Sequence, residues 1–571
     1  MPSEQKAIIR RAPLSEALVS DNAVLQRVYS HRGIASSSDL DMALNRLLPP
    51  SDLPDIALAA ERLGRAIVEG EKILIVGDFD ADGATSVALC MLVLRALGAK
   101  DVDFLVPNRF EFGYGLSTEI VELAREQNPR VIVTVDNGIS SNAGVALANE
   151  YGIDVIVTDH HLPGNERPAA CAVVNPSLPE SQFSSRALAG VGVAYYVLGV
   201  LRRWLADQGW FEHRDMPNMA NYLDLVALGT VADVVPLDAN NRRLVEQGLA
   251  RIRAGRCRPG IKALAEIGKR SLSSMVAQDL GFAIGPRLNA AGRLEDMAIG
   301  IKCLLAEEYS EARAMATALD QLNVARRQLE RDMVGDAELL LATEQADVNR
   351  IGLTVYHETF HQGVVGIVAG RIREKFNKPV ICFADAGDLA PDELKGSARS
   401  IDGLHIRDVL DVVATQHPGL LLKFGGHAMA AGLSIKRVHL QRFSVIFDKA
   451  VNAHTTEDML RAEVYSDGEL AAHELTLANA QALLAGGPWG AQFPEPMFDG
   501  EFELVSQRVV GDEHLKLVLK LDNRVIDAIA FRQPHLGPSV NRVEAVYRLS
   551  VNDYGQVPTV QLVVEYIRAL A

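Results

Sequence analysis

The sequence predicts an α/β protein in which two α/β domains are joined by a long helix and followed by a small C-terminal β-barrel. Between residues 51 and 245, short apolar strands alternate with helical stretches, which is typical of a parallel sheet covered by helices on both faces. A second stretch of this kind begins near residue 346. From about residue 456 the pattern changes to short strands separated by turns, which favours a Greek-key barrel of the oligonucleotide-binding kind.

Composition and charge exclude several classes of protein. Apolar residues at 48% and charged residues at 23% are ordinary for a folded soluble protein. The five cysteines are scattered and form no Cys-x-x-Cys pair, which argues against a zinc ribbon or a disulfide framework. The first residues contain no apolar signal core and the run at 187–201 is too short to span a bilayer, so we predict a cytoplasmic protein. The net charge of −16 disfavours a non-specific polyanion binder but does not exclude a local basic groove.

The length of 571 residues is too great for one hydrophobic core and indicates several domains. Residues 1–50 show helical periodicity, with Ser37, Ser38 and Asp39 as expected helix caps. The expected division is a helical N-terminal lead-in at 1–50, a catalytic α/β domain at 51–245, a helical connector at 246–345, a second α/β domain at 346–455 and the barrel at 456–571.

The first α/β domain carries the strongest chemical signal. Its expected strands are 73–76, 102–106, 131–135, 155–158 and 171–174, with helices such as 117–126 and 141–151 between them. Polar residues follow four of these strands, and the carboxyl ends of parallel strands are where such folds bind ligands. These residues are Asp78, Asp80 and Asp82, then Asp136 and Asn137, then Asp159, His160 and His161, and finally Asn175.

Each of these strand ends, taken alone, has two interpretations. Asp is a good turn former, so one Asp-rich loop is explained equally well as a turn. Carboxylates and histidines at three strand ends of one sheet are harder to explain in this way, because crowded carboxylates repel one another unless a cation is bound. Carboxylates with one or two imidazoles suit Mn²⁺ or Mg²⁺. We expect Asp233, near a helix end, to be a further ligand, and Asp224 to accept a hydrogen bond from a nearby donor.

The rest of the chain supplies candidate phosphate ligands. The helical connector contains GPRLNAAGR, with Arg287 and Asn289 among small residues. In the second α/β domain we expect glycine-rich turns at helix starts, whose backbone N–H groups suit phosphate, near His361, near Ser397 and Arg399, and at Gly425, Gly426 and His427. Strand composition alone does not distinguish a nucleic-acid barrel from a protein-docking barrel, although positive charge comes from Lys516, Lys520, Arg524, Arg532 and Arg548.

Motifs along the whole chain resemble those of the DHH phosphoesterase family. They include GDFDADGATS, VTVDNGISS, VTDHHLPG, LAGVGVAYY, DLVALGTVADVVPL, GPRLNAAGR, KGSARS, KFGGHAMAAG and GPWGAQFPEP. Together they are most similar to the bacterial members that degrade single-stranded DNA from the 5′ end, which act in DNA recombination and repair. The positions that bind metal in the family are intact in this sequence.

The resemblance implies a set of roles for individual residues. A pair of divalent ions, Mn²⁺ or Mg²⁺, would be bound by Asp78, Asp80, Asp82, Asp136, His160 and Asp233, with His161 and Asp159 completing or supporting the site. The second α/β domain would be the DHH-associated domain, facing the metals across a groove that admits one strand. The 5′-terminal phosphate would be held by Arg109, Arg287, Ser397 and Arg399. Tyr114 would either stack on a base or serve as a packing residue.

The activity implied is stepwise hydrolysis of single-stranded DNA from the 5′ end, with release of 5′-mononucleotides and two ions that activate water and stabilise the phosphate. The implied partners are single-stranded DNA, single-stranded-DNA-binding protein through the barrel, and a RecQ-type helicase. Two other functions remain open. One is a non-catalytic single-strand binder or replication scaffold, against which the intact acidic residues argue. The other is a DHH hydrolase of short oligoribonucleotides, cyclic dinucleotides or pyrophosphate, against which the length and the barrel argue.

Overall fold

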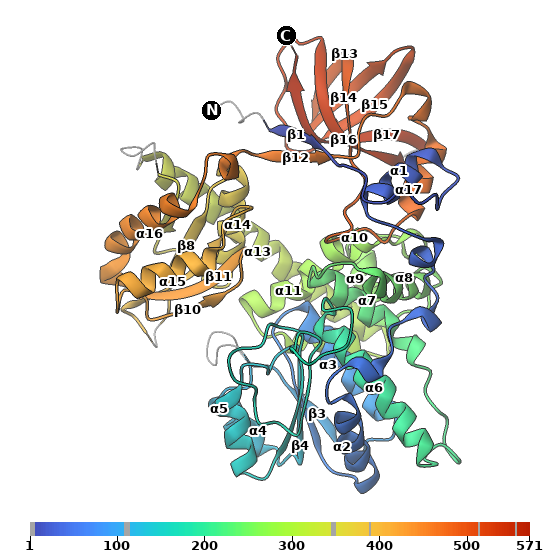
Figure 1. Ribbon diagram of the computed structural model, residues 1–571, viewed down its shortest axis with the longest axis vertical. Helices are drawn as coiled ribbons and strands as arrows, with labels where there is room; N and C mark the ends of the chain where they lie inside the picture. The colour runs from blue at the N-terminus through green and yellow to red at the C-terminus, as the bar shows by residue number, and fades with distance from the viewer. Residues whose placement is uncertain are drawn as a thin grey trace. The chain divides into compact units, whose positions relative to one another are not determined.

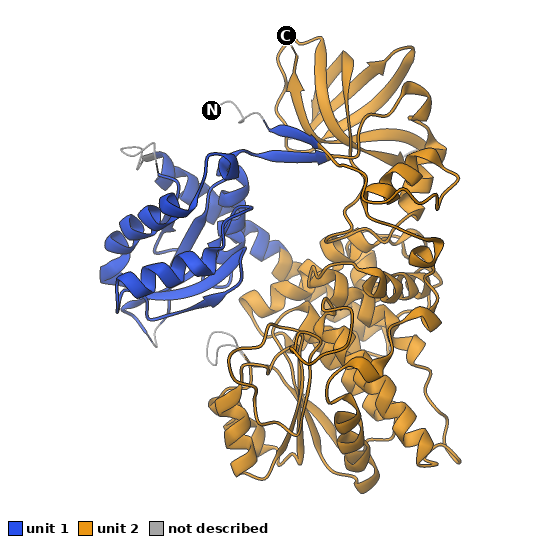
Figure 2. Cartoon of the chain, viewed as in Figure 1, with its two compact units in different colours: residues 1–9, 324–465 blue, residues 10–323, 466–571 orange. Residues whose placement is uncertain are grey.

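The computed structural model of the chain describes residues 6–107, 115–343, 350–387, 390–511, 514–553 and 557–570. These residues form two units (Figure 2). The larger unit contains residues 10–323 and 466–571, and the smaller one contains residues 1–9 and 324–465. Both units are therefore assembled from segments that are distant in the sequence.

A five-stranded parallel sheet forms the base of the larger unit. The strand order is β3-β2-β4-β5-β6, and every neighbouring pair is parallel. Because both faces of the sheet are covered, β2 and β4 are buried at every position instead of alternating, and all their residues except Thr134 are apolar. All five expected strands are confirmed, as β2 Ile73–Val76, β3 Val102–Leu105, β4 Val131–Val135, β5 Asp154–Thr158 and β6 Ala172–Val174.

Helices pack on both faces of this sheet (Figure 1). Ile73 and Ile75 of β2 share a core with α2, α3 and α6, whereas Leu74 and Val76 share another with α4 and α5. This alternation follows from the period of two along a strand. The helices are α2 Ile56–Glu69, α3 Ala81–Ala96, α4 Thr118–Glu126, α5 Asn142–Glu150 and α6 Gly190–Asp207.

The region after the sheet is helical, as expected. A single π-helical turn, Leu280–Ile284, interrupts the helical path between α10 and α11. The last helix of the region, α13, continues past residue 323 into the smaller unit. The helices are α7 Leu223–Ala232, α8 Ala239–Arg253, α9 Pro259–Ile267, α10 Ala277–Asp279, α11 Gly285–Leu294, α12 Ala298–Leu305 and α13 Tyr309–Thr343.

The smaller unit is built on a mixed sheet with the strand order β10-β11-β9-β8-β7, in which only β7 and β8 run parallel.

The prediction of glycine-rich turns at helix starts in this unit is wrong for two of the three turns. Ser397 and Arg399 lie within strand β9, and Gly425 and Gly426 end strand β10 of a hairpin, because each stretch pairs with β11. Only the stretch after His361 leads into a helix, α14. The elements are β7 Leu353–Tyr356, α14 Val365–Phe376, β8 Val380–Asp385, β9 Glu393–Arg399, α15 Ile406–Gln416, β10 Lys423–Gly426, β11 Ala430–Lys436 and α16 Leu440–His454.

The C-terminal strands close into a barrel, which confirms the expected fold. The strand order is β13-β14-β15-β17-β16, with one parallel pair, β15 and β17. Phe498, Phe502 and Tyr547 are fully buried inside it. The elements are α17 Leu477–Ala485, β13 Phe498–Val510, β14 His514–Leu521, β15 Arg524–Ala530, β16 Arg542–Asn552 and β17 Thr559–Ala569.

The N-terminal segment differs from the helical lead-in predicted for it. It begins with a strand, β1 Ala7–Arg10, which pairs with β12 Glu463–Ser466, and its one α-helix is α1 Ala23–His31. Ser37 and Asp39 lie in a 3₁₀-helix, where the Asp39 carboxylate accepts a hydrogen bond from the Ser36 N–H at 2.9 Å. Among the described residues, the helices are too short or too polar to cross a membrane.

Candidate metal centre

Seven acidic and imidazole side chains gather at the carboxyl edge of the parallel sheet. Their ligand atoms form three groups, within each of which the atoms lie no more than 4.8 Å apart. Asp136 and His160 each belong to two groups, so the three groups form one continuous cluster. The groups are Asp136, His160 and His161; Asp82, His160 and Asp233; and Asp78, Asp80 and Asp136.

The acidic loop, residues 78–82, joins β2 to the first turn of α3 and supplies three of these carboxylates. Asp80 is the N-cap of α3, and its Oδ1 accepts a hydrogen bond from the Gly83 N–H at 2.9 Å. The Asp82 carboxylate lies at the N-terminus of α6, where it accepts hydrogen bonds from the N–H groups of Gly190 (2.6 Å) and Val191 (3.0 Å). Free N–H groups at a helix N-terminus favour an anion, so two helix starts hold this loop in place.

Asp136 lies directly after β4 in a left-handed backbone conformation, with φ of +62°. This conformation is uncommon for residues other than glycine, although Asp and Asn tolerate it better than most. The start of α6 approaches Asp136 so closely that a Cβ atom added at Gly190 would lie 2.5 Å from the Asp136 Cβ. Glycine at position 190 therefore allows the helix N-terminus and two carboxylates to share one small volume.

Asp159 positions the two histidines that follow β5. Its carboxylate accepts hydrogen bonds from the N–H groups of Ile139 (2.9 Å) and His160 (2.7 Å), and Oδ1 lies 2.7 Å from His161 Nδ1. The arrangement leaves His160 Nε2 at 3.1 Å from an Asp136 carboxylate oxygen and 3.6 Å from one of Asp233. A carboxylate behind a histidine fixes its tautomer and ring orientation, which is a common arrangement at metal sites.

Burial and mutual repulsion make this cluster unfavourable without a cation. Burial, together with the charge on Asp80, raises the pKa of Asp82 to about 7. Burial and the neighbouring carboxylates, Asp82 first, raise the pKa values of Asp136 and Asp233. Burial alone would raise the pKa of Asp159 as well, but the hydrogen bond and charge of His161 outweigh it and hold that pKa low. Oxygen-rich donors with an imidazole, crowded and buried, are the donor set that Mn²⁺ and Mg²⁺ prefer.

Asp224, a buried acid in the first turn of α7, takes no part in the cluster. Its carboxylate accepts hydrogen bonds from the N–H groups of Leu225 at 2.9 Å and Arg258 at 2.7 Å. The expectation that a donor satisfies Asp224 is therefore confirmed.

Helix α11 packs directly against the acidic loop. Asn289 Oδ1 accepts a hydrogen bond from the Ala81 N–H at 2.7 Å, so this side chain supports the loop that carries Asp80 and Asp82. Arg287, a candidate phosphate ligand, donates Nε to Asp320 at 2.9 Å. Two further candidates, Arg109 and Tyr114, lie outside the residues that the structure describes.

The smaller unit contains a second polar group, around β9. Arg399 Nη1 donates hydrogen bonds to Ser397 Oγ at 3.0 Å and to the Ala398 carbonyl at 2.8 Å, and burial lowers the pKa of this guanidinium. The start of α14 lies against the pair, since a Cβ at Gly366 would be 3.0 Å from both side chains. The sequence predicted Ser397 and Arg399 but not Gly366, although its place five residues after His361 was a usable signal. His361 Nδ1 accepts from the Gly363 N–H at 3.1 Å, and the His427 N–H donates to the Ala430 carbonyl at 2.8 Å.

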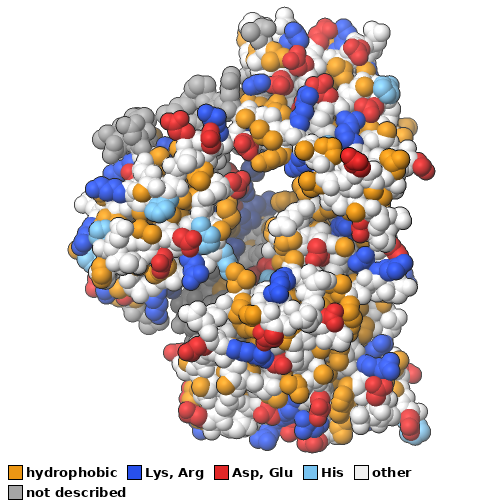
Figure 3. Space-filling view, viewed as in Figure 1, with side chains coloured by type: hydrophobic (Ala, Val, Ile, Leu, Met, Phe, Trp, Pro, Cys, Tyr) orange, Lys and Arg blue, Asp and Glu red, His pale blue; other side chains and the backbone are white. Residues whose placement is uncertain are grey.

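Most of the basic side chains predicted on the barrel lie next to acidic ones. Lys516 lies 3.7 Å from Asp527, Lys520 lies 2.8 Å from Glu503, and Arg548 lies 2.8 Å from Glu495. Basic and acidic side chains are interspersed on the face of the barrel that Figure 3 shows. The positive charge available to a polyanion is therefore smaller than the sequence indicates.

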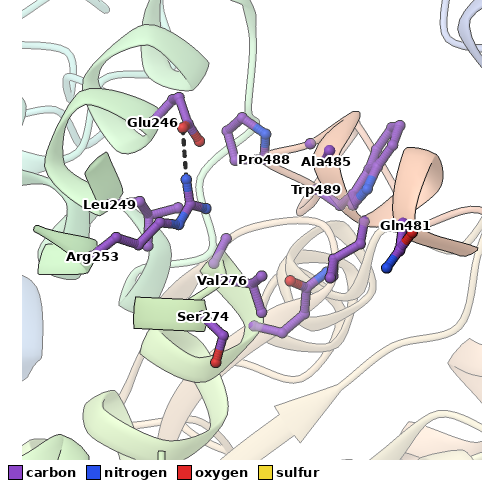
Figure 4. Close-up of a pocket in the computed structure, with 13 residues that line it drawn as sticks. Glu246, Leu249, Arg253, Ser274, Val276, Gln481, Ala485, Pro488 and Trp489 are labelled. Atoms are coloured by element: carbon purple, nitrogen blue, oxygen red, sulfur yellow. Dashed lines mark hydrogen bonds and ion pairs between the residues drawn. The ribbon is translucent and has the colours of Figure 1, made fainter. Parts of the chain in front are cut away.

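A cavity of about 380 Å³ lies elsewhere in the larger unit, between α8, α10 and α17 (Figure 4). Its walls are mainly apolar, with Leu249, Val276 and Trp489 among them. The ion pair between Glu246 and Arg253, 2.8 Å apart, lies at its edge. The cavity shares no residue with the acidic cluster, which remains the candidate for chemistry.

Comparison with known proteins identifies the family. The DHH family N-terminal domain matches residues 72–230, the DHHA1 domain residues 348–453 and the RecJ OB domain residues 466–566. The single-stranded-DNA-specific exonuclease RecJ of Dickeya dadantii is 51% identical over 98% of this chain and 98% of that protein. The RecJ of Escherichia coli is 50% identical over 95% of each.

A solved structure agrees with these sequence comparisons. The crystal structure of RecJ from Thermus thermophilus in complex with Mn²⁺ superposes with a TM-score of 0.81 at 30% identity, covering 99% of this chain and 80% of that one. The match includes the parallel sheet and the barrel, since nearly the whole chain is covered. With half of its residues identical to those of two RecJ proteins over nearly its full length, the chain belongs to the RecJ family.

Proposed function

We propose that this protein is a single-stranded-DNA-specific exonuclease that degrades DNA in the 5′→3′ direction, releases 5′-mononucleotides, and acts in DNA recombination and repair. The observation that carries the proposal is the cluster of seven acidic and imidazole side chains at the carboxyl edge of the sheet. Its relatives in D. dadantii and E. coli are named as exonucleases with this substrate. A complete ligand set favours catalysis over the alternative of a non-catalytic scaffold.

The cofactor in this proposal is Mn²⁺ or Mg²⁺, as a pair of ions. RecJ of T. thermophilus has been crystallised with each metal. The bound cations supply positive charge that polarises the scissile phosphate and lowers the pKa of water. The ligands in this proposal are Asp78, Asp80, Asp82, Asp136, His160, His161 and Asp233, with Asp159 as a positioning residue behind His161.

The protein's own residues position the strand and its end. Five crowded carboxylates would repel a phosphate, and two dications nearly neutralise their combined charge, so that a phosphate could approach the site. Arg399, held by Ser397, would bind the 5′-terminal phosphate together with Arg287 and Arg109, because a guanidinium donates to two oxygens at once. Binding would require Arg287 to exchange Asp320 for phosphate.

The five-part division of the chain stays part of the proposal. The segments 51–245, 346–455 and 456–571 would be the catalytic, DHH-associated and oligonucleotide-binding domains, with 1–50 as a lead-in and 246–345 as a connector. The barrel would bind single-stranded DNA and single-stranded-DNA-binding protein, and a RecQ-type helicase would be a further partner. Because basic side chains on the barrel surface are paired with acidic ones, the barrel is better suited to contact a protein than to bind DNA strongly by itself.

The experiment uses one oligonucleotide labelled at either end, single-stranded or annealed, with Mn²⁺ or with EDTA. We expect the 5′ label to appear at once as a mononucleotide, the 3′-labelled strand to shorten gradually, and the blunt duplex and the EDTA samples to stay intact. Early release of the 3′ label, internal cuts, or equal degradation of duplex DNA would contradict the proposal. Degradation of only very short oligonucleotides would favour the short-substrate hydrolase.

A further inference from the structure

One large aromatic side chain near the metal centre is almost fully exposed. Phe282 belongs to the π-helical turn Leu280–Ile284, and 81% of its surface is accessible, the highest value for an aromatic side chain among the exposed large apolar residues of the described chain. Leaving a phenylalanine in water forgoes the stabilisation that its burial would give. π-turns are rare and occur frequently at functional sites. The combination points to a ligand for this ring.

The π-turn lies against the helix that leads to Asp233. A Cβ atom at Gly281 would lie 3.3 Å from Val231 Cγ1, and one at Gly285 would lie 3.2 Å from Ala232 Cβ. Gly281 and Gly285 flank Phe282 in sequence, and Val231 and Ala232 immediately precede Asp233. The ring therefore projects from backbone that is packed one residue away from a member of the metal cluster.

The same helical segment also touches the other side of the cluster. Asn289, two turns after Phe282, accepts a hydrogen bond from the Ala81 N–H, between Asp80 and Asp82. A Cβ at Gly292 would lie 1.8 Å from the Phe79 carbonyl oxygen, so α11 and the acidic loop are in direct backbone contact. The backbone that carries Phe282 is thus held at a fixed place relative to the carboxylates, as the support of a positioning group should be.

A second exposed apolar residue follows Asp233. Val234 is 69% exposed and has φ of +62°, which is a real outlier for a β-branched side chain. Its N–H donates to the Val231 carbonyl at 3.3 Å, which keeps it at the end of α7. Backbone strain of this kind persists where the surrounding structure imposes it, and it is concentrated at functional sites. Two exposed apolar side chains therefore project from backbone that adjoins Asp233.

We propose that Phe282 stacks on a nucleobase of the strand whose phosphate is bound at the metal centre, with Val234 on the border of the same surface. This inference rests on the proposed function, because it takes single-stranded DNA as the ligand. The bases of a single strand expose flat apolar faces, and stacking on an aromatic ring tolerates every base. Such a contact would hold the strand in place without reading its sequence. Duplex DNA would not use it, since its bases are already stacked on each other.

The first test measures binding in EDTA, where no hydrolysis occurs. Single-stranded oligonucleotides carry one 2-aminopurine at each of the first few positions from the 5′ end, because stacking quenches its fluorescence. We expect the wild type to quench it most strongly at one position. Phe282→Ala and Phe282→Leu should lose quenching at that position alone, and Phe282→Trp should restore it. Leu58→Ala, which removes another exposed apolar side chain (53% accessible), should behave like the wild type.

The second test measures kcat/KM with Mn²⁺ on oligonucleotides that contain one abasic residue at each position in turn. Removing the stacked base should cost the wild type on the order of tenfold. Phe282→Ala should lose a similar factor on the intact strand, and should then be insensitive to the abasic residue at that position. The two losses would not multiply, because they remove the same contact.

Three outcomes would overturn the inference. Phe282→Ala could cleave and quench like the wild type, or lose activity equally at every abasic position. It could also unfold at a lower temperature while Phe282→Leu does not, which would mean that the ring packs against another part of this protein. Failure of the proposed function is a separate result, in which the wild type itself leaves single-stranded DNA intact with Mn²⁺.

Discussion

Asp136 shows how single residues determine the chemistry of the site. The Asp136 side chain is buried, and one of its carboxylate oxygens lies 3.1 Å from His160 Nε2. Its pKa is raised by burial and also by the charges of the neighbouring carboxylates. Like charges confined in this way destabilise the folded state. A bound dication reverses the sign of the effect, so the residues that bind metal should reduce stability when no metal is present.

Asp136→Asn tests this reversal. Asn also tolerates the left-handed backbone, so the change removes charge without adding strain. In EDTA the variant should be at least as stable as the wild type. With Mn²⁺ at about 100 times its Kd, the wild type should gain about 2.7 kcal/mol and the variant much less, as thermal unfolding would report. Asp207→Asn, at an exposed ion pair, should gain as much as the wild type, and an equal gain by Asp136→Asn would remove Asp136 from the ligand set.

Gly190→Ala tests whether the close approach of the α6 N-terminus to Asp136 is needed. Its new Cβ would lie 2.5 Å from the Asp136 Cβ and 2.7 Å from Oδ1, so the helix or the carboxylate must shift. We expect a loss of about 1–3 kcal/mol in the free energy of unfolding and weaker Mn²⁺ binding. Gly199→Ala in the same helix is the matched control, because its Cβ would meet no atom within 4 Å. If both variants bind Mn²⁺ equally well, the close approach is not needed.

Most of the candidate site could be predicted from the sequence, but its internal support could not. Carboxylates after successive parallel strands must meet at one edge, so the placement of Asp78, Asp136 and His160 followed from the strand pattern alone. The hydrogen bonds around Asp159 depend on where the Ile139 N–H points, which no residue type reveals. The requirement for glycine at position 190 likewise appears only when the start of α6 is brought against the end of β4.

At the scale of elements, the N-terminal helix α1 is fixed to the C-terminal part of the larger unit by one buried ion pair. Arg32, which follows α1, donates Nη1 and Nη2 to the two carboxylate oxygens of Asp467 at 2.7 and 2.9 Å. His31 Nδ1 lies 3.0 Å from Asp467 Oδ1. Burial would raise the pKa of Asp467, but Arg32 and His31 outweigh it and hold the pKa below its usual value.

This pair predicts a pH-dependent contribution to stability. Because the pKa of Asp467 is lower in the folded state, the contribution is fully present above the unfolded value of about 3.9 and is lost as the pH falls through the folded pKa. At about pH 7, Asp467→Asn should cost about 3 kcal/mol in the free energy of unfolding, because it leaves a buried arginine unpaired. Denaturant unfolding should show this difference narrowing below about pH 4. Asp207→Asn should change little at either pH, and a pH-independent cost for Asp467→Asn would contradict the assignment.

Some strands could not be predicted from the sequence because the strands they pair with lie far away along the chain. β1 is a four-residue strand near the N-terminus that pairs with β12, beyond the second α/β domain, and its composition is equally compatible with a helix. Ser397 and Arg399 were expected in a turn, since glycine and serine dominate that stretch, but pairing between β9, β8 and β11 makes it a central strand. Tertiary pairing overrode local preference in both cases.

At the scale of the whole molecule, the order of the α/β regions and the barrel could be predicted, because each has its own hydrophobic period. The grouping of these regions into two units could not be predicted. The barrel belongs to the same unit as the metal centre, although residues 324–465 separate them in sequence, and α13 continues from one unit into the other. The central claim for this molecule is that the acidic cluster is a divalent-cation site that hydrolyses single-stranded DNA.

Cleavage of 5′-end-labelled single-stranded DNA by Asp80→Asn with Mn²⁺ tests this claim most directly. Asn can keep the N-cap hydrogen bond to the Gly83 N–H, so the variant should fold while losing one ligand charge. We predict that hydrolysis falls by at least about a thousandfold relative to the wild type, while DNA binding in EDTA stays unchanged and the unfolding temperature in EDTA is at least that of the wild type. A correctly folded Asp80→Asn protein that releases mononucleotides at the wild-type rate would contradict the account.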